Sequence, residues 1–296
     1  MNDQLTTDAG GRAPWVQLPG APAHLIDELV SLAGRADALL LQHYNNADGI
    51  GVERKSDSSP VTLADRDAHD LILRGLNQLT PDIPVLSEES PAEQISERLN
   101  WKRCWIVDPL DGTKEFIGRT GEFTINIALI DQGRPILGLL SVPTQGLCYV
   151  GIPGQGAWCI DPVDDAGQRP VRALGVQALS PQLPLRVLAS VRHNADRVAA
   201  VLSKLERVGT GTRRINAGSA LKFCALLEAQ ADIYPRTSPC YEWDVAAGDA
   251  LVTAAGGFVV DTQGAPLRYN QRDSLLVERF IAGADDAIDW PGLLHR

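Results

Sequence analysis

The chain has 296 residues, of which 44% are hydrophobic and 22% are charged, and its formal net charge is -10. This composition is ordinary for a soluble globular protein, and the length allows one large domain or two fused halves with a sizeable core. The acidic balance argues against a nucleic acid polymer as partner, but a small phosphorylated ligand remains compatible because bound cations can make one pocket positive.

The N-terminal stretch and the cysteines indicate where the protein works. Residues 1–20 lack the apolar core of a signal peptide, and we expect a flexible tail there. No apolar run approaches the ~20 residues that span a bilayer. The five cysteines are scattered and contain no Cys-x-x-Cys pair, which disfavours a zinc site or a disulfide framework. A cytoplasmic protein without a transmembrane segment is therefore expected.

The first half, residues 21–180, is expected to begin with two helices and to continue as a sheet. Apolar residues recur with helical spacing over residues 24–44 and 62–79. The pattern weakens over residues 161–180, and we place the boundary between the halves there. Short apolar runs between glycines and prolines predict strands at 85–86, 104–107, 123–130, 136–141 and 147–150.

The second half, residues 181–296, alternates between the two kinds of element. Its expected strands are residues 185–190, 232–234 and 258–261. Its expected helices are residues 195–208, 219–230 and 243–255. We therefore predict a mixed α/β (α+β) protein of layered sheets and helices.

The most informative segment follows the expected strand at 104–107 and reads Asp108-Pro109-Leu110-Asp111-Gly112-Thr113. Proline restricts the backbone of this turn and glycine lets it approach a ligand closely. We therefore expect Asp108, Asp111 and the Leu110 carbonyl to point at one place. Hard oxygen donors of this kind suit Mg²⁺, which also binds the phosphate oxygens of a substrate. The alternative is that the Asp-Pro and Asp-Gly pairs only form a turn.

Three further acidic residues stand at the ends of expected elements. Glu88 follows a short apolar strand, while Asp65 and Asp244 each open an expected helix. Taken singly, Glu88 is explained as a solvated strand end and Asp244 as a carboxylate at a helix start. Asp65 is explained as the partner of Thr62 in a capping box.

Gathered in one place, these carboxylates would require positive charge. Two bare carboxylates ~4 Å apart repel by roughly 4 kcal/mol at an effective dielectric constant of about 20. Two or more divalent cations relieve this repulsion, generate a hydroxide and stabilise the leaving oxygen of an in-line displacement. The acidic residues together therefore indicate metal-dependent phosphate chemistry.

Together with Trp243-Asp244-Val245-Ala246-Ala247-Gly248, the segment at residues 108–113 resembles the inositol monophosphatase superfamily of lithium-sensitive, magnesium-dependent phosphatases. The resemblance extends over about residues 24–284 and implies a layered α-β-α-β-α sandwich. Within the superfamily the chain is most similar to the bacterial 3'(2'),5'-bisphosphate nucleotidases of sulfur assimilation. Lys114-Glu115-Phe116 carries this similarity, because inositol phosphatases usually have Thr-Asn-Phe there.

The resemblance implies a metal site for two to three Mg²⁺ ions. Glu88, Asp108 and the Leu110 carbonyl would hold one ion. Asp108, Asp111 and Asp244 would hold a second, and a third, weaker ion would lie near Glu88. Glu88 is thereby also a candidate catalytic residue.

The resemblance also implies roles in catalysis and substrate binding. Thr113 with Asp65 would activate the attacking water, and the Gly112 and Thr113 amides would hold phosphate oxygens. Ser219 and Lys222 would contact the nucleotide, although a helix N-cap and a solvated lysine explain these two residues nearly as well. The implied substrate-binding residues are Asp111, Gly112, Thr113, Ser219, Lys222 and Asp244, with Arg236 and Glu242 as further candidates for the pocket wall.

The predicted activity is hydrolysis of the 3'-phosphate of 3'-phosphoadenosine 5'-phosphate to AMP and phosphate. Inositol monophosphate and fructose 1,6-bisphosphate remain alternative substrates. A catalytically dead nucleotide or metal sensor is the alternative from another class, disfavoured because no acidic or water-activating position is substituted. The sequence carries no signal for the oligomeric state. Some relatives are thought to attach to the inner membrane, but no basic amphipathic stretch favours this here.

Overall fold

The computed structural model describes residues 5–6, 18, 24–46, 52–54, 60–189, 195–206, 208 and 210–295. Most of the predicted tail, residues 1–20, lies outside these residues, so its flexibility stays a prediction. Of that stretch, β1 (Leu5–Thr6) pairs in parallel with β10 (Arg169–Leu174), and Leu18 is buried.

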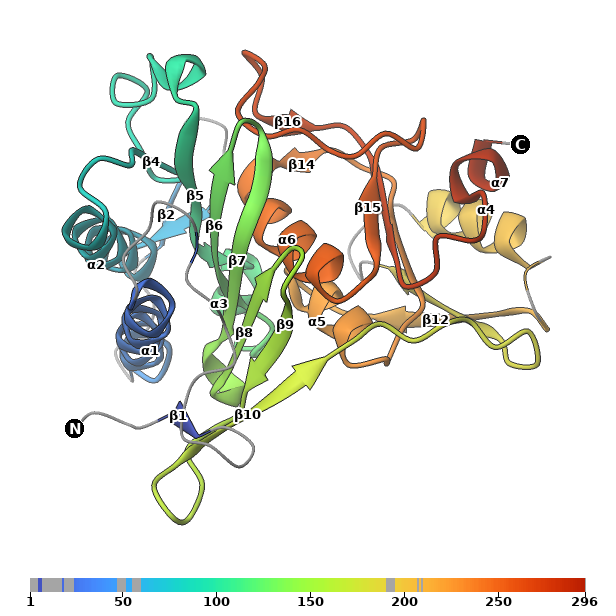
Figure 1. The fold of residues 1–296 in the computed structure, drawn as a ribbon, viewed down its shortest axis with the longest axis horizontal. Coiled ribbons are helices and arrows are strands. Elements are labelled where there is room, and N and C mark those ends of the chain that lie inside the picture. The colour runs from blue at the N-terminus through green and yellow to red at the C-terminus, as the bar shows by residue number, and fades with distance from the viewer. Residues whose placement is uncertain are drawn as a thin grey trace.

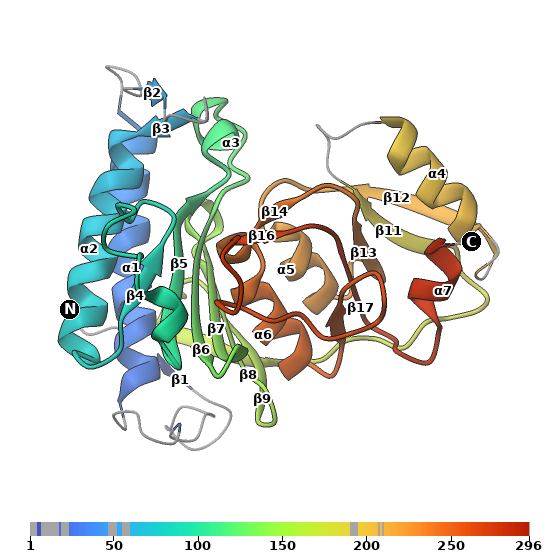
Figure 2. The same ribbon diagram turned by 90° about the horizontal axis from the view of Figure 1, so that it is seen from above.

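Five layers make up the fold, and they are seen edge-on in Figure 2. Two long helices cover the outer face of a large sheet, two helices lie between this sheet and a smaller one, and two more cover the far side of the smaller sheet (Figures 1 and 2). In this order the helices are α1 (Leu25–Tyr44) and α2 (Leu63–Leu79), α5 (Leu221–Leu227) and α6 (Ala246–Ala254), and α4 (Ala195–Leu205) and α7 (Trp290–His295). The predicted α-β-α-β-α sandwich is confirmed.

The large sheet has the strand order β1-β10-β9-β8-β7-β6-β5-β4 and is antiparallel from β10 to β5. Its remaining strands are β4 (Val85–Ser87), β5 (Arg103–Asp111), β6 (Thr124–Asp131), β7 (Arg134–Val142), β8 (Leu147–Ile152) and β9 (Gly156–Ile160). The turn after β5 leads into the short helix α3 (Thr113–Ile117). Apart from β1, which lies within residues 1–20, the strands of this sheet come from the first half of the chain.

The smaller sheet has the order β12-β11-β13-β17-β15 and comes from the second half. Its strands are β11 (Leu185–Ala189), β12 (Thr212–Asn216), β13 (Ile233–Arg236), β15 (Phe258–Val260) and β17 (Phe280–Gly283). Two short strand pairs lie outside both sheets: β2 (Val52–Arg54) with β3 (Pro60–Thr62), and β14 (Cys240–Tyr241) with β16 (Leu276–Val277).

The large sheet has an apolar layer on each face. Along β6, Ile125 and Ile127 pack in the cluster around α1 and α2, whereas Ala128 and Ile130 pack in the cluster around α5 and α6. A strand covered on both faces reads as a continuous apolar run, which is why this segment was predicted from sequence. The cluster around α5 and α6 contains side chains from both halves of the chain, so the halves share one hydrophobic core.

Two glycines of the large sheet bring α6 unusually close to it. A Cβ atom at Gly138 of β7 would lie 2.4 Å from the carbonyl oxygen of Ala247, and one at Gly151 of β8 would lie 2.6 Å from the Cα atom of Leu251. Only glycine permits such an approach. The start of α6 is thereby held against the same sheet that carries the Asp108–Asp111 segment.

The structure differs from the sequence prediction at several elements. Strands β9, β10, β12 and β17 were not predicted, and β10 falls in the stretch taken as a boundary. The helix expected at 219–230 is shorter, because Ser219 and Ala229 adopt left-handed backbone conformations with φ of 47° and 51°. All five cysteines are free and buried. Among the described helices, none combines the length and apolar character needed to cross a bilayer.

Candidate active site

Asp108 and Asp111 lie at the end of β5, where an irregular pairing brings both onto one face. Asp108 pairs with Asn126 of β6. Asp111, three residues on, pairs with Thr124, which is only two residues from Asn126. In a regular strand, residues three apart point to opposite faces, and one extra residue in a bulge restores the same face. The bulge thus lets both carboxylates face the interior layer of helices.

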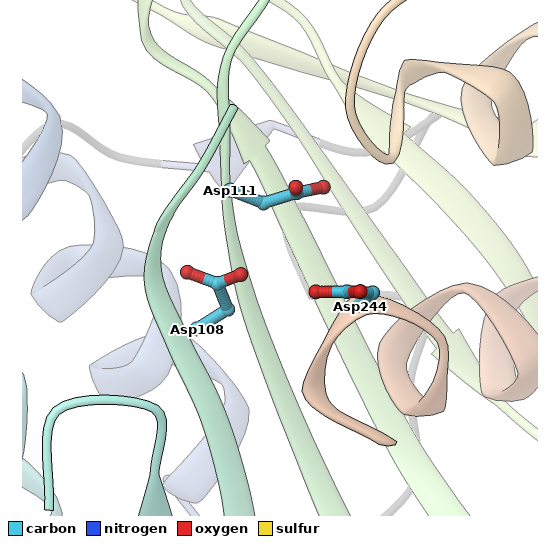
Figure 3. A group of neighbouring side chains, drawn as sticks. All are labelled: Asp108, Asp111 and Asp244. Carbon is cyan, nitrogen blue, oxygen red and sulfur yellow. The ribbon is translucent and has the colours of Figure 1, made fainter. Parts of the chain in front are cut away.

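Asp244 completes a group of three aspartates. It belongs to the 3₁₀ helix η3 (Glu242–Asp244), directly before α6, and accepts a hydrogen bond from the Tyr241 amide at 2.9 Å. One carboxylate oxygen from each of Asp108, Asp111 and Asp244 lies within 4.8 Å of the others. Figure 3 shows the three carboxylates around a common space. Residues from the two halves of the chain therefore meet at one point.

The three-aspartate cluster is costly to ionise. Burial, together with the charges of Asp111 and Glu88, raises the pKa of Asp244 to about 8. Burial also raises the pKa of Asp108 well above its usual value, and Glu88 is the largest of the neighbouring charges that add to this effect. Glu88 is therefore near enough to act on both aspartates. A divalent cation would offset these charges, and carboxylate oxygens are ligands that hard cations prefer, so this donor set fits a metal.

We expect a divalent metal to stabilise the protein more at pH 8 than at pH 6. With the pKa values of Asp108 and Asp244 raised, the metal-free folded state binds more protons than the unfolded chain. The stability that this provides is present at low pH and is lost as pH rises through the folded-state pKa values. Metal displaces the protons and reverses the loss. Melting temperatures in EDTA and in Mg²⁺ at both pH values measure this; an equal metal-induced rise at both would contradict it.

Thr113 and Asp65 form a hydrogen-bonded pair beside the cluster. The Thr113 hydroxyl donates to Asp65 Oδ1 at 3.2 Å and lies 3.4 Å from the Leu110 carbonyl oxygen. The other oxygen of Asp65, Oδ2, accepts hydrogen bonds from the amide and hydroxyl of Thr62 at 2.7 and 2.6 Å. The capping box is thus present, and it fixes the carboxylate while leaving Oδ1 directed at Thr113. The capping box is therefore compatible with a further role for Asp65.

Gly112 has a conformation that requires glycine. Its φ is 96°, and a Cβ atom there would lie 2.9 Å from the carbonyl oxygen of Glu122 and 3.2 Å from Cβ of Ser219. The backbone therefore turns sharply between Asp111 and Thr113. This turn sends the two side chains on either side of Gly112 to different parts of the site.

Ser219 contacts an aspartate and does not cap a helix. Its hydroxyl lies 2.7 Å from Asp111 Oδ2, which also accepts a hydrogen bond from the Ala220 amide at 2.7 Å. Helix α5 begins at Leu221 with no side-chain cap. The N-cap explanation of Ser219 is therefore wrong, and the residue joins α5 to the aspartate cluster.

A cavity of about 250 Å³ opens beside the aspartates. Its wall includes Asp111, Gly112, Lys114, Ser219, Lys222, Arg236 and Asp244. Lys222 is only 3% exposed and donates to the Ser219 carbonyl at 2.9 Å, so the explanation as a solvated lysine is wrong. Burial lowers the pKa of Lys222 to about 8. Lys222 and Arg236 thus provide positive charge in the same cavity wall as Asp111 and Asp244.

Glu242 does not belong to this wall. Its side chain is fully buried, and its Oε2 accepts a hydrogen bond from the Asn270 amide at 2.6 Å. Sequence reasoning also missed wall residues such as Tyr234 and Cys240. A single tyrosine or cysteine gives no functional signal in a sequence, because each is common in cores.

Comparisons with known proteins agree with this geometry. Residues 22–288 match the sequence profile of the Inositol monophosphatase family. The chain is 45% identical over 252 residues to the 3'(2'),5'-bisphosphate nucleotidase CysQ of Escherichia coli O157:H7, covering 85% of this chain and 96% of the relative. The CysQ of Haemophilus influenzae is 32% identical, over 92% of this chain and 97% of the relative. The crystal structure of CysQ from Bacteroides thetaiotaomicron matches with a TM-score of 0.73 and 34% identity, covering 88% of this chain and 97% of that one.

Proposed function

The chain belongs to the inositol monophosphatase family, and from this premise we propose that it is a 3'(2'),5'-bisphosphate nucleotidase. The reaction is hydrolysis of the 3'-phosphate of 3'-phosphoadenosine 5'-phosphate to AMP and phosphate. The observation that carries the proposal is the meeting of Asp108, Asp111 and Asp244 within 4.8 Å beside the Thr113–Asp65 pair. We place the enzyme in the cytoplasm, in the recycling of nucleotides formed during sulfur assimilation.

Magnesium is the proposed metal, in two to three ions. Glu88, Asp108 and the Leu110 carbonyl would hold one, and Asp108, Asp111 and Asp244 another. Bound there, the ions would lower the pKa of an attacking water and stabilise charge on the phosphate oxygens. The raised pKa values of Asp108 and Asp244 support this assignment, because a site built for cations has excess negative charge without them.

Thr113 and Asp65 are the residues proposed to take the proton of the attacking water. The Thr113 hydroxyl already donates to Asp65 Oδ1, so its lone pairs are free to accept a hydrogen bond from water. Asp65 is held in place by Thr62, which prevents the carboxylate from turning away. The pair therefore orients the nucleophile and provides a route for its proton.

The wall that carries Lys222 and Arg236 is the proposed binding surface for the rest of the nucleotide. A bisphosphate substrate has a second phosphate, which an inositol monophosphate lacks, and cationic side chains near the cluster suit it. Ser219 would contact the nucleotide, and the amides of Gly112 and Thr113 would hold oxygens of the phosphate that is removed. The names of the nucleotidase relatives support the same substrate class.

A panel of phosphorylated substrates tests the proposal. Phosphate release would be measured with Mg²⁺ from 3'-phosphoadenosine 5'-phosphate, inositol monophosphate and fructose 1,6-bisphosphate at equal concentrations. We expect the highest kcat/KM for the nucleotide. Much faster turnover of inositol monophosphate or the sugar bisphosphate would reject the nucleotidase assignment while keeping the phosphatase class. No turnover of any substrate would favour a sensor.

Lithium is expected to inhibit the enzyme at millimolar-scale concentrations. Li⁺ is a small hard cation with one charge less than Mg²⁺, so it can enter an oxygen-lined position without giving the same stabilisation to a phosphate. Initial rates at fixed Mg²⁺ with added LiCl would measure the effect, and NaCl at equal ionic strength is the control. Rates that fall equally with both salts would contradict a specific lithium site.

A further inference from the structure

Two polar side chains interrupt the apolar inner face of β6. Successive residues of a strand point to opposite faces, so Thr124 and Asn126 share a face with Ala128 and Ile130, which pack around α5 and α6. Thr124 is 0% exposed and Asn126 is 1% exposed. A buried hydroxyl or amide is unfavourable unless it is hydrogen-bonded. The two residues therefore need a reason beyond filling space.

Their hydrogen bonds connect separate parts of the second half of the chain. Thr124 Oγ1 lies 2.8 Å from Ser219 Oγ, in the segment before α5. Thr124 also donates to Asn126 Oδ1 at 2.8 Å, and Asn126 Nδ2 donates to the Trp243 carbonyl at 3.3 Å. One strand of the large sheet is thus joined to the segments that precede both interior helices.

Both ends of this row of polar contacts reach the aspartate cluster. At one end, the Ser219 hydroxyl is 2.7 Å from Asp111 Oδ2. At the other end, the Trp243 carbonyl is in the residue directly before Asp244. Asp111 and Asp244 belong to different halves, and this row of polar contacts spans the junction between them. Ser219 and Thr124 have one hydroxyl proton each, so in any one arrangement two of the three contacts from Asp111 to Asn126 are hydrogen bonds.

From this connection we infer that Thr124 and Asn126 are positioning residues for the metal site. They act through Ser219 and Trp243 and hold the carboxylates of Asp111 and Asp244 at the separation that a shared cation requires. Residues that orient metal ligands in this way commonly change metal affinity 10–100-fold when they are removed. The inference rests on the proposed function, since that proposal assigns a metal to these aspartates.

Thr124→Val tests the inference, because valine keeps the branched shape and removes the hydroxyl. We expect the Kd of the metal-free protein for Mn²⁺, measured by titration calorimetry, to rise at least about tenfold. We also expect the Mg²⁺ concentration for half-maximal activity to rise by a similar factor. Thr124→Ser, which retains the hydroxyl, is expected to restore both values to near those of the wild type.

Thr80→Val is the matched control. Thr80 is also buried, at 5% exposure, accepts a hydrogen bond from Trp105 Nε1 at 2.9 Å and donates to the Leu76 carbonyl at 3.1 Å. It lies at the end of α2, away from the cluster. Loss of its hydroxyl should lower the melting temperature without changing the Mn²⁺ affinity. A general loss of stability is thereby separated from a loss of positioning.

The inference is overturned if Thr124→Val lowers only the melting temperature, as Thr80→Val does, and leaves the Kd for Mn²⁺ unchanged. Asn126→Ala removes the contacts with Thr124 and with the Trp243 carbonyl, and it gives a second measurement should Thr124→Val not fold. An unchanged Kd for Mn²⁺ in Asn126→Ala would also overturn the inference. The calorimetry does not depend on the substrate. If the wild type binds Mn²⁺ but does not hydrolyse the bisphosphate, the proposed function fails and the positioning inference is still tested.

Discussion

Asp108→Asn is expected to lower kcat by at least about a thousandfold, because metal ions supply several kcal/mol to phosphate chemistry and Asp108 is proposed to bind two of them. The amide retains an oxygen that can accept the hydrogen bond from the Leu110 amide at 3.0 Å, so the turn should survive. Kinetics with 3'-phosphoadenosine 5'-phosphate would measure the loss of kcat, and calorimetry with Mn²⁺ would measure the accompanying loss of metal affinity.

The same substitution has an opposite expected effect on the metal-free protein. Asp108 is buried among Glu88, Asp111 and Asp244, and its raised pKa shows that its charge is unfavourable there. Asparagine removes that charge, so the melting temperature in EDTA should rise, and more so at pH 8 than at pH 6. The increase in melting temperature on adding Mg²⁺ should be smaller than in the wild type. A variant that is inactive because it is misfolded would instead melt at a lower temperature in EDTA.

Asp131→Asn is the control for this experiment. Asp131 stands at the opposite end of the same strand pair and forms a salt bridge with Arg103 at 2.6 Å. Its loss should leave kcat and metal affinity unchanged, since neither residue faces the cluster. If Asp131→Asn and Asp108→Asn lost activity equally, the assignment of Asp108 as a metal ligand would be wrong.

Thr113→Val is expected to lower kcat by about 10²–10⁴, the range that positioned proton transfer commonly contributes. Valine cannot donate to Asp65 or accept a hydrogen bond from water, but it has nearly the shape of threonine. The metal affinity should change little, because the aspartate carboxylates keep their places. The rate constant under saturating Mg²⁺ and the Kd for Mn²⁺ separate these two quantities.

Thr113→Ser is the companion variant, since it keeps the hydroxyl that donates to Asp65 Oδ1. It should retain much of the activity that valine loses. Equal losses of rate and of metal affinity in the valine variant would contradict the proton-transfer role and would point to a structural role for Thr113 in the metal site.

Local patterns in the sequence were enough to identify the chemistry and the family. The Asp108-Pro109-Leu110-Asp111-Gly112-Thr113 segment determines its own turn, because proline and glycine restrict the backbone over only a few residues. The capping box of Thr62 and Asp65 is likewise a matter of neighbouring residues, and it is present in the structure. The family assignment that these motifs predicted is confirmed by the match over residues 22–288.

Contacts between distant segments were decided only by the tertiary structure. Asp244 reaches Asp108 because Gly138 and Gly151 let α6 approach the large sheet, which no local pattern reveals. The surroundings of Lys222 and Glu242 were also not predictable, since burial depends on which other elements cover a residue. Lys222 is a buried cationic residue in the cavity wall, whereas Glu242 is a buried carboxylic acid outside that wall.

Local features could be predicted from the sequence and distant contacts could not, for a single physical reason. Backbone preferences and caps act over three or four residues and can be recognised in a sequence, whereas burial, distances between carboxylates and pKa shifts arise from packing across the whole chain. The sequence by itself therefore determined the family, and it indicated the residues to which we assign the phosphate chemistry. The fold decided how close the aspartate carboxylates lie to one another and that Lys222 and Arg236 share the cavity wall with two of them. It also decided that Thr124 and Asn126 connect the two halves of the chain.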